Sequence, residues 1–214
     1  QCCPEMEVVE TGLKDRPAFL DGGVDLVYVG SATERGLQLM VQALAPYRAE
    51  LERYVDGGGL MLATGNSLDA LGEYVVIDGK RAFDGLGLLK THAEYHMMKR
   101  HNSFLLGSFQ DMEIVGFKSL FGHSYPDQEL ADALFRVERG VGRPPGTYAE
   151  GFRRGGLMAT YLIGPLLPLN PPFTRYLLEQ MGAKDVKLAF EDTAMKAYRA
   201  RVEEFRDEKR GYQY

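Results

Sequence analysis

Apolar residues in the first third of the chain form two short runs, separated by a longer stretch with helical spacing. The short runs, Val24–Val29 and Leu60–Ala63, are closed or preceded by glycines and predict buried strands of a parallel sheet. Between them, apolar side chains recur every three or four residues from about Thr33 to Val55, which predicts a helix. Pro46 lies inside this stretch and is expected to kink the helix or divide it.

Beyond Gly72 the apolar runs are shorter and alternate with turns. With an alternating run at the N-terminus, they predict strands at Met6–Glu10, Tyr74–Ile77, Phe104–Phe109, Glu113–Lys118, Leu134–Arg139 and Leu157–Ile163. Helical spacing near the C-terminus predicts helices at Pro172–Met181 and Asp192–Phe205. Because a strand, a helix and a strand in this order imply a right-handed crossover, we expect an α/β fold with a mostly parallel central sheet flanked by helices.

Composition limits the classes of function. The 214 residues include 45% hydrophobic and 26% charged residues and carry a formal net charge of -5, which fits one globular domain over residues 1–214. The negative charge argues against nucleic-acid binding through bulk electrostatics. No apolar run reaches the roughly 18 residues needed to cross a bilayer, and the only cysteines are the adjacent Cys2 and Cys3. We therefore expect a cytoplasmic protein without membrane insertion.

The segment Gly57–Gly72 contains the clearest functional signal. Its buried strand runs directly into a tight turn and then into a helix. In α/β enzymes a sharp turn between strand and helix lifts one side chain above the sheet, and a catalytic nucleophile often sits there. Free backbone N–H groups at the start of the helix could stabilise a developing oxyanion.

The same segment resembles the nucleophile region of class I glutamine amidotransferases. The similarity is to the cobyric-acid-synthase-like branch, which includes the glutaminase subunit of lipid II isoglutaminyl synthase. Where members read approximately A-I-C-G-G-Y-Q-L-L-G, this chain reads A-T-G-N-S-L-D-A-L-G over Ala63–Gly72. Gly65 therefore occupies the position of the family's cysteine nucleophile.

A second, longer match lies downstream. The family's histidine segment reads approximately G-T-Y-L-H-G-P-L-L-P-K-N-P, and Ala159–Pro171 reads A-T-Y-L-I-G-P-L-L-P-L-N-P, so Ile163 replaces the histidine. The resemblance extends from Glu7 to about Ala200 and implies a flavodoxin-like class I amidotransferase fold. Family members usually begin earlier, with a strand, a Y-G-D-R-G-N loop and a helix that have no counterpart in this sequence.

Both replacements remove chemistry that the family needs. Glutamine hydrolysis requires a thiolate that attacks the side-chain amide and a histidine that transfers the proton. Glycine has no side chain to form an acyl-enzyme, and isoleucine cannot accept a proton. The nearby hydroxyls of Thr64 and Ser67 have no histidine close in sequence to activate them. We therefore expect no glutaminase activity, and interpret Gly65 as a relaxed turn and Ile163 as a buried strand residue.

The resemblance also indicates residues that could still bind a small ligand. Arg100 and Asn102 fall roughly where the family has an arginine and a G-N pair lining its glutamine pocket. Gly30 begins the segment that replaces the family's glycine-rich oxyanion loop, and Asn66 follows the nucleophile position. No cofactor is indicated.

The histidines raise the question of a metal site. His92 and His96 are four residues apart with Glu94 between them, a spacing that could hold a metal on a helix. The residues after Gly87 indicate an extended or irregular segment instead, where the two imidazoles would not converge. We therefore predict a polar surface loop and no metal site.

Three functions remain open at this point. The first is a degenerate amidotransferase that binds or regulates an amide-forming synthetase, which the resemblance implies to be Mur-ligase-like or cobyric-acid-synthase-like. The second is an enzyme of different chemistry in the same crevice, with Asp69, Glu150 or a histidine as acid or base. The third is a protein that binds glutamine without hydrolysing it.

Overall fold

A mostly parallel sheet forms the centre of the molecule in the computed structural model, which describes residues 6–126 and 133–212. Its strands lie in the order β1 (Leu26–Val29), β2 (Leu60–Thr64), β12 (Leu157–Thr160) and β11 (Phe152–Arg154). The first three are parallel and β11 is antiparallel to β12. The predicted mostly parallel central sheet is therefore confirmed.

The crossover from β1 to β2 is helical, as predicted, and Pro46 divides it. Helix α1 (Glu34–Leu44) is followed by a single 3₁₀ turn, η2 (Ala45–Tyr47), and by α2 (Arg48–Asp56). The Thr33 hydroxyl caps α1 by accepting a hydrogen bond of 3.1 Å from the Gly36 N–H. The apolar stripe of both helices packs on one face of the sheet, through Leu37, Val41, Leu51, Val55, Met61 and Ala63.

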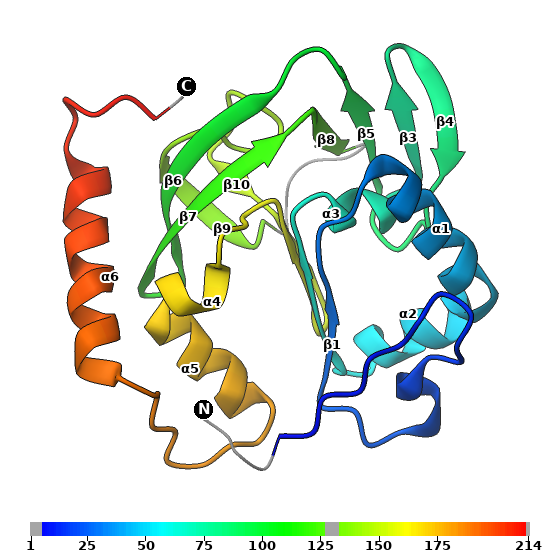
Figure 1. Ribbon diagram of the computed structural model, residues 1–214, viewed down its shortest axis with the longest axis horizontal. Coiled ribbons are helices and arrows are strands. Elements are labelled where there is room, and N and C mark those ends of the chain that lie inside the picture. Colours follow the sequence, from blue (N-terminus) through cyan, green and yellow to red (C-terminus); the bar gives the residue numbers. More distant parts are fainter. Residues whose placement is uncertain (1–5, 127–132, 213–214) are drawn as a thin grey trace.

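Two further four-stranded sheets follow in the chain. One has the order β4 (Lys80–Asp84), β3 (Tyr74–Ile77), β5 (Thr91–Tyr95), β8 (Gly122–Pro126). The other has the order β10 (Ala149–Glu150), β9 (Phe135–Arg139), β6 (His101–Phe109), β7 (Met112–Leu120). The long antiparallel hairpin β6–β7 lies on the side of the central sheet opposite α1 and α2 (Figure 1).

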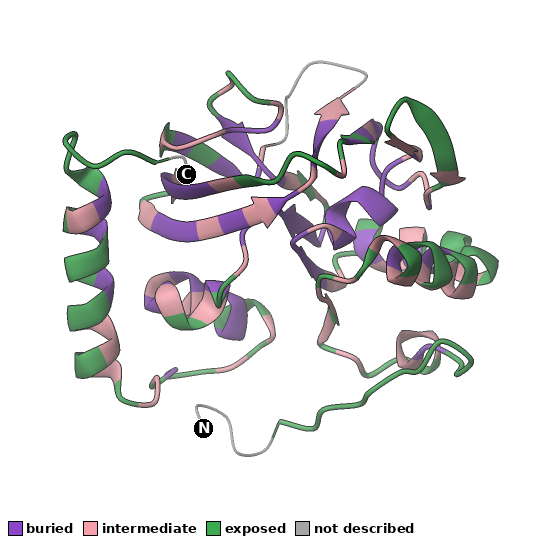
Figure 2. Cartoon of the chain, turned by 45° about the horizontal axis from the view of Figure 1, so that its top comes forward, coloured by how far each residue is buried: buried purple, intermediate pink, exposed green. Residues whose placement is uncertain are grey.

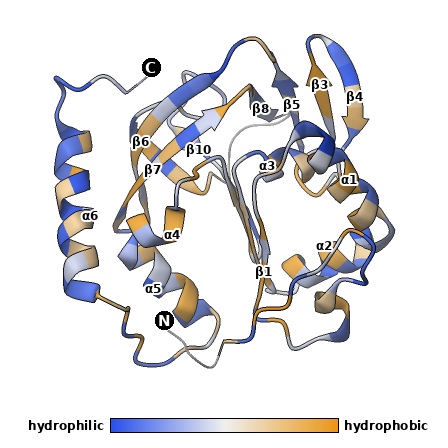
Figure 3. Ribbon diagram, in the orientation of Figure 1, coloured by the Kyte–Doolittle hydropathy of each residue, from blue (hydrophilic) through white to orange (hydrophobic). Residues whose placement is uncertain are grey.

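Five further helices complete the described part of the chain. They are η1 (Ala18–Asp21), α3 (Ser67–Ala70), α4 (Leu166–Leu169), α5 (Pro171–Gln180) and α6 (Glu191–Arg206). Helix α6 is largely hydrophilic with interspersed hydrophobic bands (Figure 3), and its buried side faces the β6–β7 hairpin (Figure 2). Tyr198, Val202 and Phe205 make this contact, as the predicted apolar stripe required. Among the described residues, no helix is both long and apolar enough to cross a membrane.

Several predicted boundaries need correction. Met6–Glu10 forms no strand, because it pairs with no described strand. The run Leu157–Ile163 stays a strand only to Thr160, since Leu162 and Ile163 turn toward α4. Strands β4, β5, β8, β10 and β11 were not predicted, because their polar composition hides the strand pattern.

Candidate functional site

The turn between β2 and α3 has the backbone shape of a nucleophile elbow. Strand β2 ends at Thr64, and the first residue of α3 is Ser67. Gly65 between them is buried and has φ +64°, a left-handed conformation that glycine adopts without the clash of a Cβ atom. The predicted sharp turn from strand to helix is confirmed.

Ser31 and Ile163 fill the space above this turn. A Cβ atom built on Gly65 would lie 1.8 Å from the Ser31 Oγ and 3.0 Å from the Ile163 Cγ2. The structure thus brings together the two positions that the sequence singles out. It adds Ser31, which lies in the segment that replaces the family's oxyanion loop but was not predicted to contact Gly65. A side chain at position 65 has no room unless Ser31 moves.

Ile163 is not the buried strand residue that the sequence predicted. It is half-buried and lies beyond the end of β12, where its N–H donates to the Phe117 carbonyl at 2.8 Å in an isolated bridge to β7. Its side chain therefore faces the crevice, because the chain turns out of the sheet one residue after Tyr161.

The side chains next to the elbow fix the loop after β1. The Asn66 side chain accepts from the Ala32 N–H at 3.0 Å and donates to the Ala32 carbonyl at 2.8 Å. The Ser67 hydroxyl is within 2.8 Å of the Thr64 carbonyl and 3.0 Å of the Val29 carbonyl. Asn66 and Ser67 thus hold the loop after β1 against the elbow.

A small polar pocket of about 200 Å³ opens beside the elbow. Its lining comprises Ser31, Ala32, Glu34, Gly65, Asn66, Tyr95, Arg100, Ser119, Leu120, Phe121, Tyr161 and Ile163. It places the carboxylate-bearing Glu34 and the guanidinium-bearing Arg100 in one pocket, with Arg100 4.7 Å from the Phe121 ring centroid. Of the ligand candidates, Arg100 and Asn66 line this pocket, whereas Asn102 lies within β6 opposite Ser119 and Gly30 follows β1.

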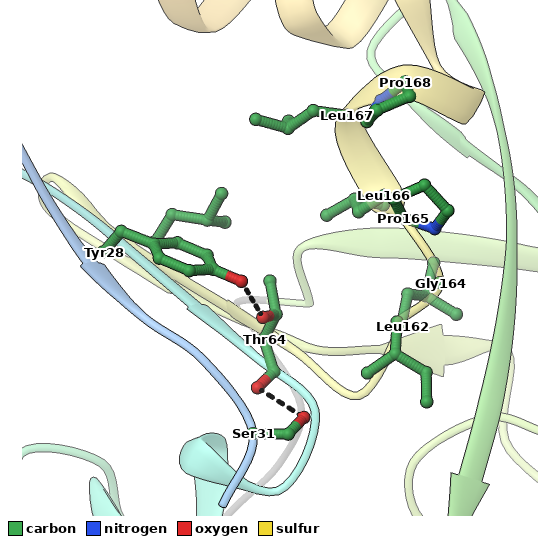
Figure 4. A pocket seen from close by; sticks show the side chains of 11 residues that line it. Tyr28, Ser31, Thr64, Leu162, Gly164, Pro165, Leu166, Leu167 and Pro168 are labelled. Atoms are coloured by element: carbon green, nitrogen blue, oxygen red, sulfur yellow. Dashed lines mark hydrogen bonds between the residues drawn. The ribbon is translucent and has the colours of Figure 1, made fainter.

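A larger and mainly apolar cleft lies on the other side of Ser31 and Ile163, with a volume of about 510 Å³ (Figure 4). Its walls are Tyr28 and Thr64 on the strand side and Leu162 through Pro168 on the side of α4. The Tyr28 and Thr64 hydroxyls are 2.9 Å apart. Ser31 and Ile163 line both hollows, so they separate the polar pocket from the apolar cleft.

A solved structure shares this architecture. A structure described as "Crystal structure of glutamine amidotransferase" matches with a TM-score of 0.52 and 16% sequence identity, covering 76% of this chain and 82% of that chain. The chain has the fold of a class I glutamine amidotransferase.

Sequence comparison points in the same direction, although no model of a known protein family matches. The subunit GatD of lipid II isoglutaminyl synthase (glutamine-hydrolyzing) from Staphylococcus aureus (strain N315) is 29% identical over 157 residues, which is 73% of this chain. The same subunit from Streptococcus pneumoniae (strain ATCC BAA-255 / R6) is 22% identical over 185 residues, 81% of this chain. The matches span 63% and 69% of the two relatives' lengths. The resemblance to an amidotransferase-like domain is therefore supported.

A buried carboxylate lies directly beneath the elbow of this amidotransferase-like domain. Asp69 accepts hydrogen bonds from the Tyr95 hydroxyl at 2.5 Å and from the Tyr161 hydroxyl. Burial raises the pKa of Asp69 to about 7, although both tyrosines and Arg143 oppose the shift. Asp69 is 3% exposed and does not line either hollow, so its contacts are with the two tyrosines rather than with a ligand space.

Stability is expected to depend on the Asp69 proton. Because the folded pKa is about 7 and the ordinary value is 3.8, the folded state keeps a proton that the unfolded state loses between these values. The free energy of unfolding should therefore fall as pH rises from 4 to 7 and then level off. Between pH 4 and pH 7 the parent should lose roughly 3–4 kcal/mol of unfolding free energy that the Asp69→Asn variant, which has no proton to lose there, keeps. Urea unfolding at pH 4.5 and 8 measures the difference, and parallel curves would contradict it.

A buried ion pair supports the strands on either side. Lys118 and Glu150 are 2% and 0% exposed and lie 2.6 Å apart. Glu150 also accepts from the Thr160 hydroxyl at 2.9 Å and the Tyr161 N–H at 2.8 Å, which ties β10 to the end of β12. Glu150 was predicted as a possible acid or base, but its contacts are those of a structural residue. Lys118 was not predicted as a site residue, because the run around it is apolar.

The histidines lie outside the elbow. His92 is in strand β5 and stacks between Tyr74 and Tyr125, at 5.0 and 5.7 Å between ring centroids, so the predicted extended conformation is confirmed. The predicted surface loop is wrong, because every second residue of β5 is buried in the sheet. The ring centroids of His123 and His101 are 4.6 Å apart. Burial, and after it the charge of His101, lowers the pKa of His123 to about 4. Within residues 6–126 and 133–212, no group of three or more His, Cys, Asp and Glu side chains could hold a metal ion.

Proposed function

We propose that this amidotransferase-like domain does not hydrolyse glutamine and acts as a non-catalytic partner or regulatory subunit of an amide-forming synthetase. The observation that carries the proposal is the closed elbow. Gly65 offers no nucleophile, and Ser31 fills the space that a side chain there would need. Thiol acylation requires a sulfur atom at this point and a base beside it, and Ile163 supplies no base.

The hydroxyls near the elbow do not replace the missing thiol. The Thr64 hydroxyl is 2.9 Å from the Tyr28 hydroxyl, and the Ser67 hydroxyl contacts two backbone carbonyls. A serine or threonine nucleophile needs a general base within hydrogen-bond reach. No histidine is among the residues that line the polar pocket or the apolar cleft.

The relatives suggest the class of partner. Both are named as subunits of lipid II isoglutaminyl synthase, so the synthetase partner we propose belongs to peptidoglycan amidation and is Mur-ligase-like, with a cobyric-acid-type synthetase as the alternative. A cytoplasmic location is part of the same proposal. An intact scaffold with lost chemistry fits a subunit whose remaining task is to bind, because fold and site chemistry are separable.

Purification of the native protein from its own cells tests the partner role. The proposal predicts a stoichiometric synthetase of the Mur-ligase or cobyric-acid type in the purified sample, identified by mass spectrometry. A chain that emerges alone from gentle purification, at the concentration where known subunits stay associated, would contradict it.

A second candidate is a protein that binds an amino acid without hydrolysing it. The polar pocket favours this function because Glu34 and Arg100 offer opposite charges to the ammonium and carboxylate groups of a free amino acid. Calorimetric titration with glutamine would show binding that weakens in Arg100→Ala, and an absence of binding heat would exclude this candidate. The third candidate, an enzyme of other chemistry, has less support because Asp69 and Glu150 are enclosed by structural partners.

A further inference from the structure

Two tyrosines connect the buried Asp69 carboxyl to the polar pocket. The Tyr95 hydroxyl donates to one Asp69 oxygen, Oδ2, at 2.5 Å, and the Tyr161 hydroxyl donates to the other oxygen, Oδ1. Asp69 itself does not line the pocket, whereas both tyrosines are among the residues that line it. A change at the carboxyl therefore reaches the pocket through a tyrosine hydroxyl.

Protonation of Asp69 requires one of these hydrogen bonds to reverse. An ionised carboxylate only accepts, so both tyrosine protons point at it. A protonated carboxyl carries one O–H group, which has to donate to a tyrosine oxygen because each carboxyl oxygen faces a tyrosine hydroxyl. The tyrosine that accepts must turn its own proton toward another acceptor, since a buried hydroxyl proton without a partner is costly.

The charges on the two sides decide which tyrosine turns its proton. Burial, and after it the Asp69 carboxylate, raises the pKa of both tyrosine hydroxyls. The Glu34 carboxylate adds to this rise of the pKa on Tyr95, whereas the Arg143 guanidinium opposes it on Tyr161. A proton turned away by Tyr95 thus meets an anion, and one turned away by Tyr161 meets a cation. Tyr95 is therefore the hydroxyl that reverses.

The Tyr95 hydroxyl has its other neighbours in the pocket. The Asn66 side chain acts on it through a hydrogen bond and Glu34 acts on it through its charge. Both residues line the pocket of about 200 Å³. A proton that turns away from Asp69 consequently points toward groups that a ligand in this pocket would also contact.

The surroundings of Asp69 allow both protonation states near neutral pH. Of the described residues, Arg143 and Glu150 are the charged groups that act on Asp69, with opposite signs, and burial outweighs them and raises its pKa to about 7. Arg143 is fully buried, and its two terminal nitrogens have no hydrogen-bond partner in the described part of the chain. It therefore forms no direct ion pair that would keep Asp69 ionised at lower pH.

We propose that Asp69 and Tyr95 form a proton switch under the polar pocket. With Asp69 protonated, the Tyr95 hydroxyl donates into the pocket; with Asp69 ionised, it offers the pocket only an acceptor. A ligand carboxylate is then favoured below neutral pH, where it binds together with one proton, and a ligand N–H group is favoured above it. This ligand preference rests on the amino-acid-binding candidate of the proposed function, whereas the switch itself does not.

The side-chain amide of Asn66 reports the switch without any ligand. In amide correlation NMR spectra of the full chain between pH 5 and 9, its two N–H signals should move with a midpoint near pH 7. In Asp69→Asn an N–H group donates where the protonated carboxyl would, so the signals should stay at their low-pH positions throughout. Asn66 signals that do not titrate in the parent, or that titrate unchanged in Asp69→Asn, would overturn the proposal.

Two matched variants separate a relay through Tyr95 from the field of the Asp69 charge. Tyr95→Phe should abolish the titration of the Asn66 signals. Tyr161→Phe removes the same group from the other carboxyl oxygen and should keep the titration, with a higher midpoint because a hydrogen bond to the ionised form is lost. Thermal unfolding checks that both variants fold. A titration that persists in Tyr95→Phe would overturn the relay.

Glutamate and glutamine are the matched probes for the ligand preference, because they differ only at the end of the side chain and the glutamate side chain stays ionised above about pH 5.5. In calorimetric titrations at pH 5.5 and 8.5, the affinity for glutamate relative to glutamine should fall roughly 10-fold or more as pH rises. Asp69→Asn should hold this ratio constant. A constant ratio in the parent would overturn the proposal. If neither probe binds, the amino-acid-binding candidate fails, and the Asn66 signals still decide on the switch.

Discussion

Gly65→Ala is expected to lower the free energy of unfolding by roughly 3 kcal/mol or more. Two causes add: the new Cβ atom meets the Ser31 Oγ at 1.8 Å, and a non-glycine residue is strained at φ +64°. Adding Ser31→Gly to this variant removes the overlap and should restore most of the lost unfolding free energy. About 1 kcal/mol should remain lost, because the backbone at position 65 is still strained. Urea unfolding of the parent, both single variants and the double variant measures this coupling.

Gly79→Ala is the matched control for the backbone part. Gly79 also has a left-handed φ, +79°, but no atom lies within 4 Å of a Cβ built there. The Gly79→Ala substitution should lower the free energy of unfolding by only about 1 kcal/mol, and adding Ser31→Gly should not change this loss. Equal losses at positions 65 and 79 would show that Ser31 does not fill the elbow, and the structural basis for the closed site would fail.

Neutralising one member of the buried Lys118–Glu150 pair should cost roughly 3–5 kcal/mol, because the remaining charge is left without its partner. Lys118→Met and Glu150→Gln are suitable, since glutamine keeps an acceptor for the Tyr161 N–H. The double variant should lose much less than the sum of the singles. Chemical unfolding measures all three, and additive losses would contradict the predicted coupling.

The exposed Arg81–Asp84 pair is the control for this cycle. Its nitrogen and oxygen atoms are 2.6 Å apart, as in the buried pair, but the side chains are 59% and 74% exposed. Solvent screens such a pair, so removing either charge should change the free energy of unfolding by less than about 1 kcal/mol. A comparable loss at both pairs would show that burial is not the cause.

Hydrophobic spacing was sufficient to predict the framework around the site. It identified β1, the divided crossover helix and β2, because apolar residues there follow one period over long stretches. It failed for β5 and β8, whose sequences T-H-A-E-Y and G-H-S-Y-P are polar at every second or third position. It also predicted a strand at Met6–Glu10, since period alone cannot report whether a pairing partner is present.

The candidate site was predicted in part. The turn at Gly65 followed from the quoted motifs, whereas Ile163 was wrongly predicted to be a buried strand residue. The filling by Ser31 depends on a contact between residues 34 positions apart. The same holds for the burial of Lys118 against Glu150, 32 positions away. Such contacts are set by strand order and register, which no local pattern in the sequence specifies.

The closed elbow also explains why a single reverting substitution is not expected to restore chemistry. On the proposed function, a cysteine at position 65 would need Ser31 to be displaced and a base at position 163, so three residues would have to change together. The scaffold beneath it, with Asp69 bound by Tyr95 and Tyr161, is nevertheless fully assembled. A retained scaffold with a closed site fits the proposed binding role.

Ammonia release from glutamine by the purified chain tests the central claim most directly. The assay is run with and without the synthetase that copurifies, and with an active glutaminase as positive control. We expect no release above the buffer blank in either case, and no change in Thr64→Val or Ser67→Ala. Release at an enzyme-like rate that tracks with this chain through purification, and falls in either variant, would contradict it.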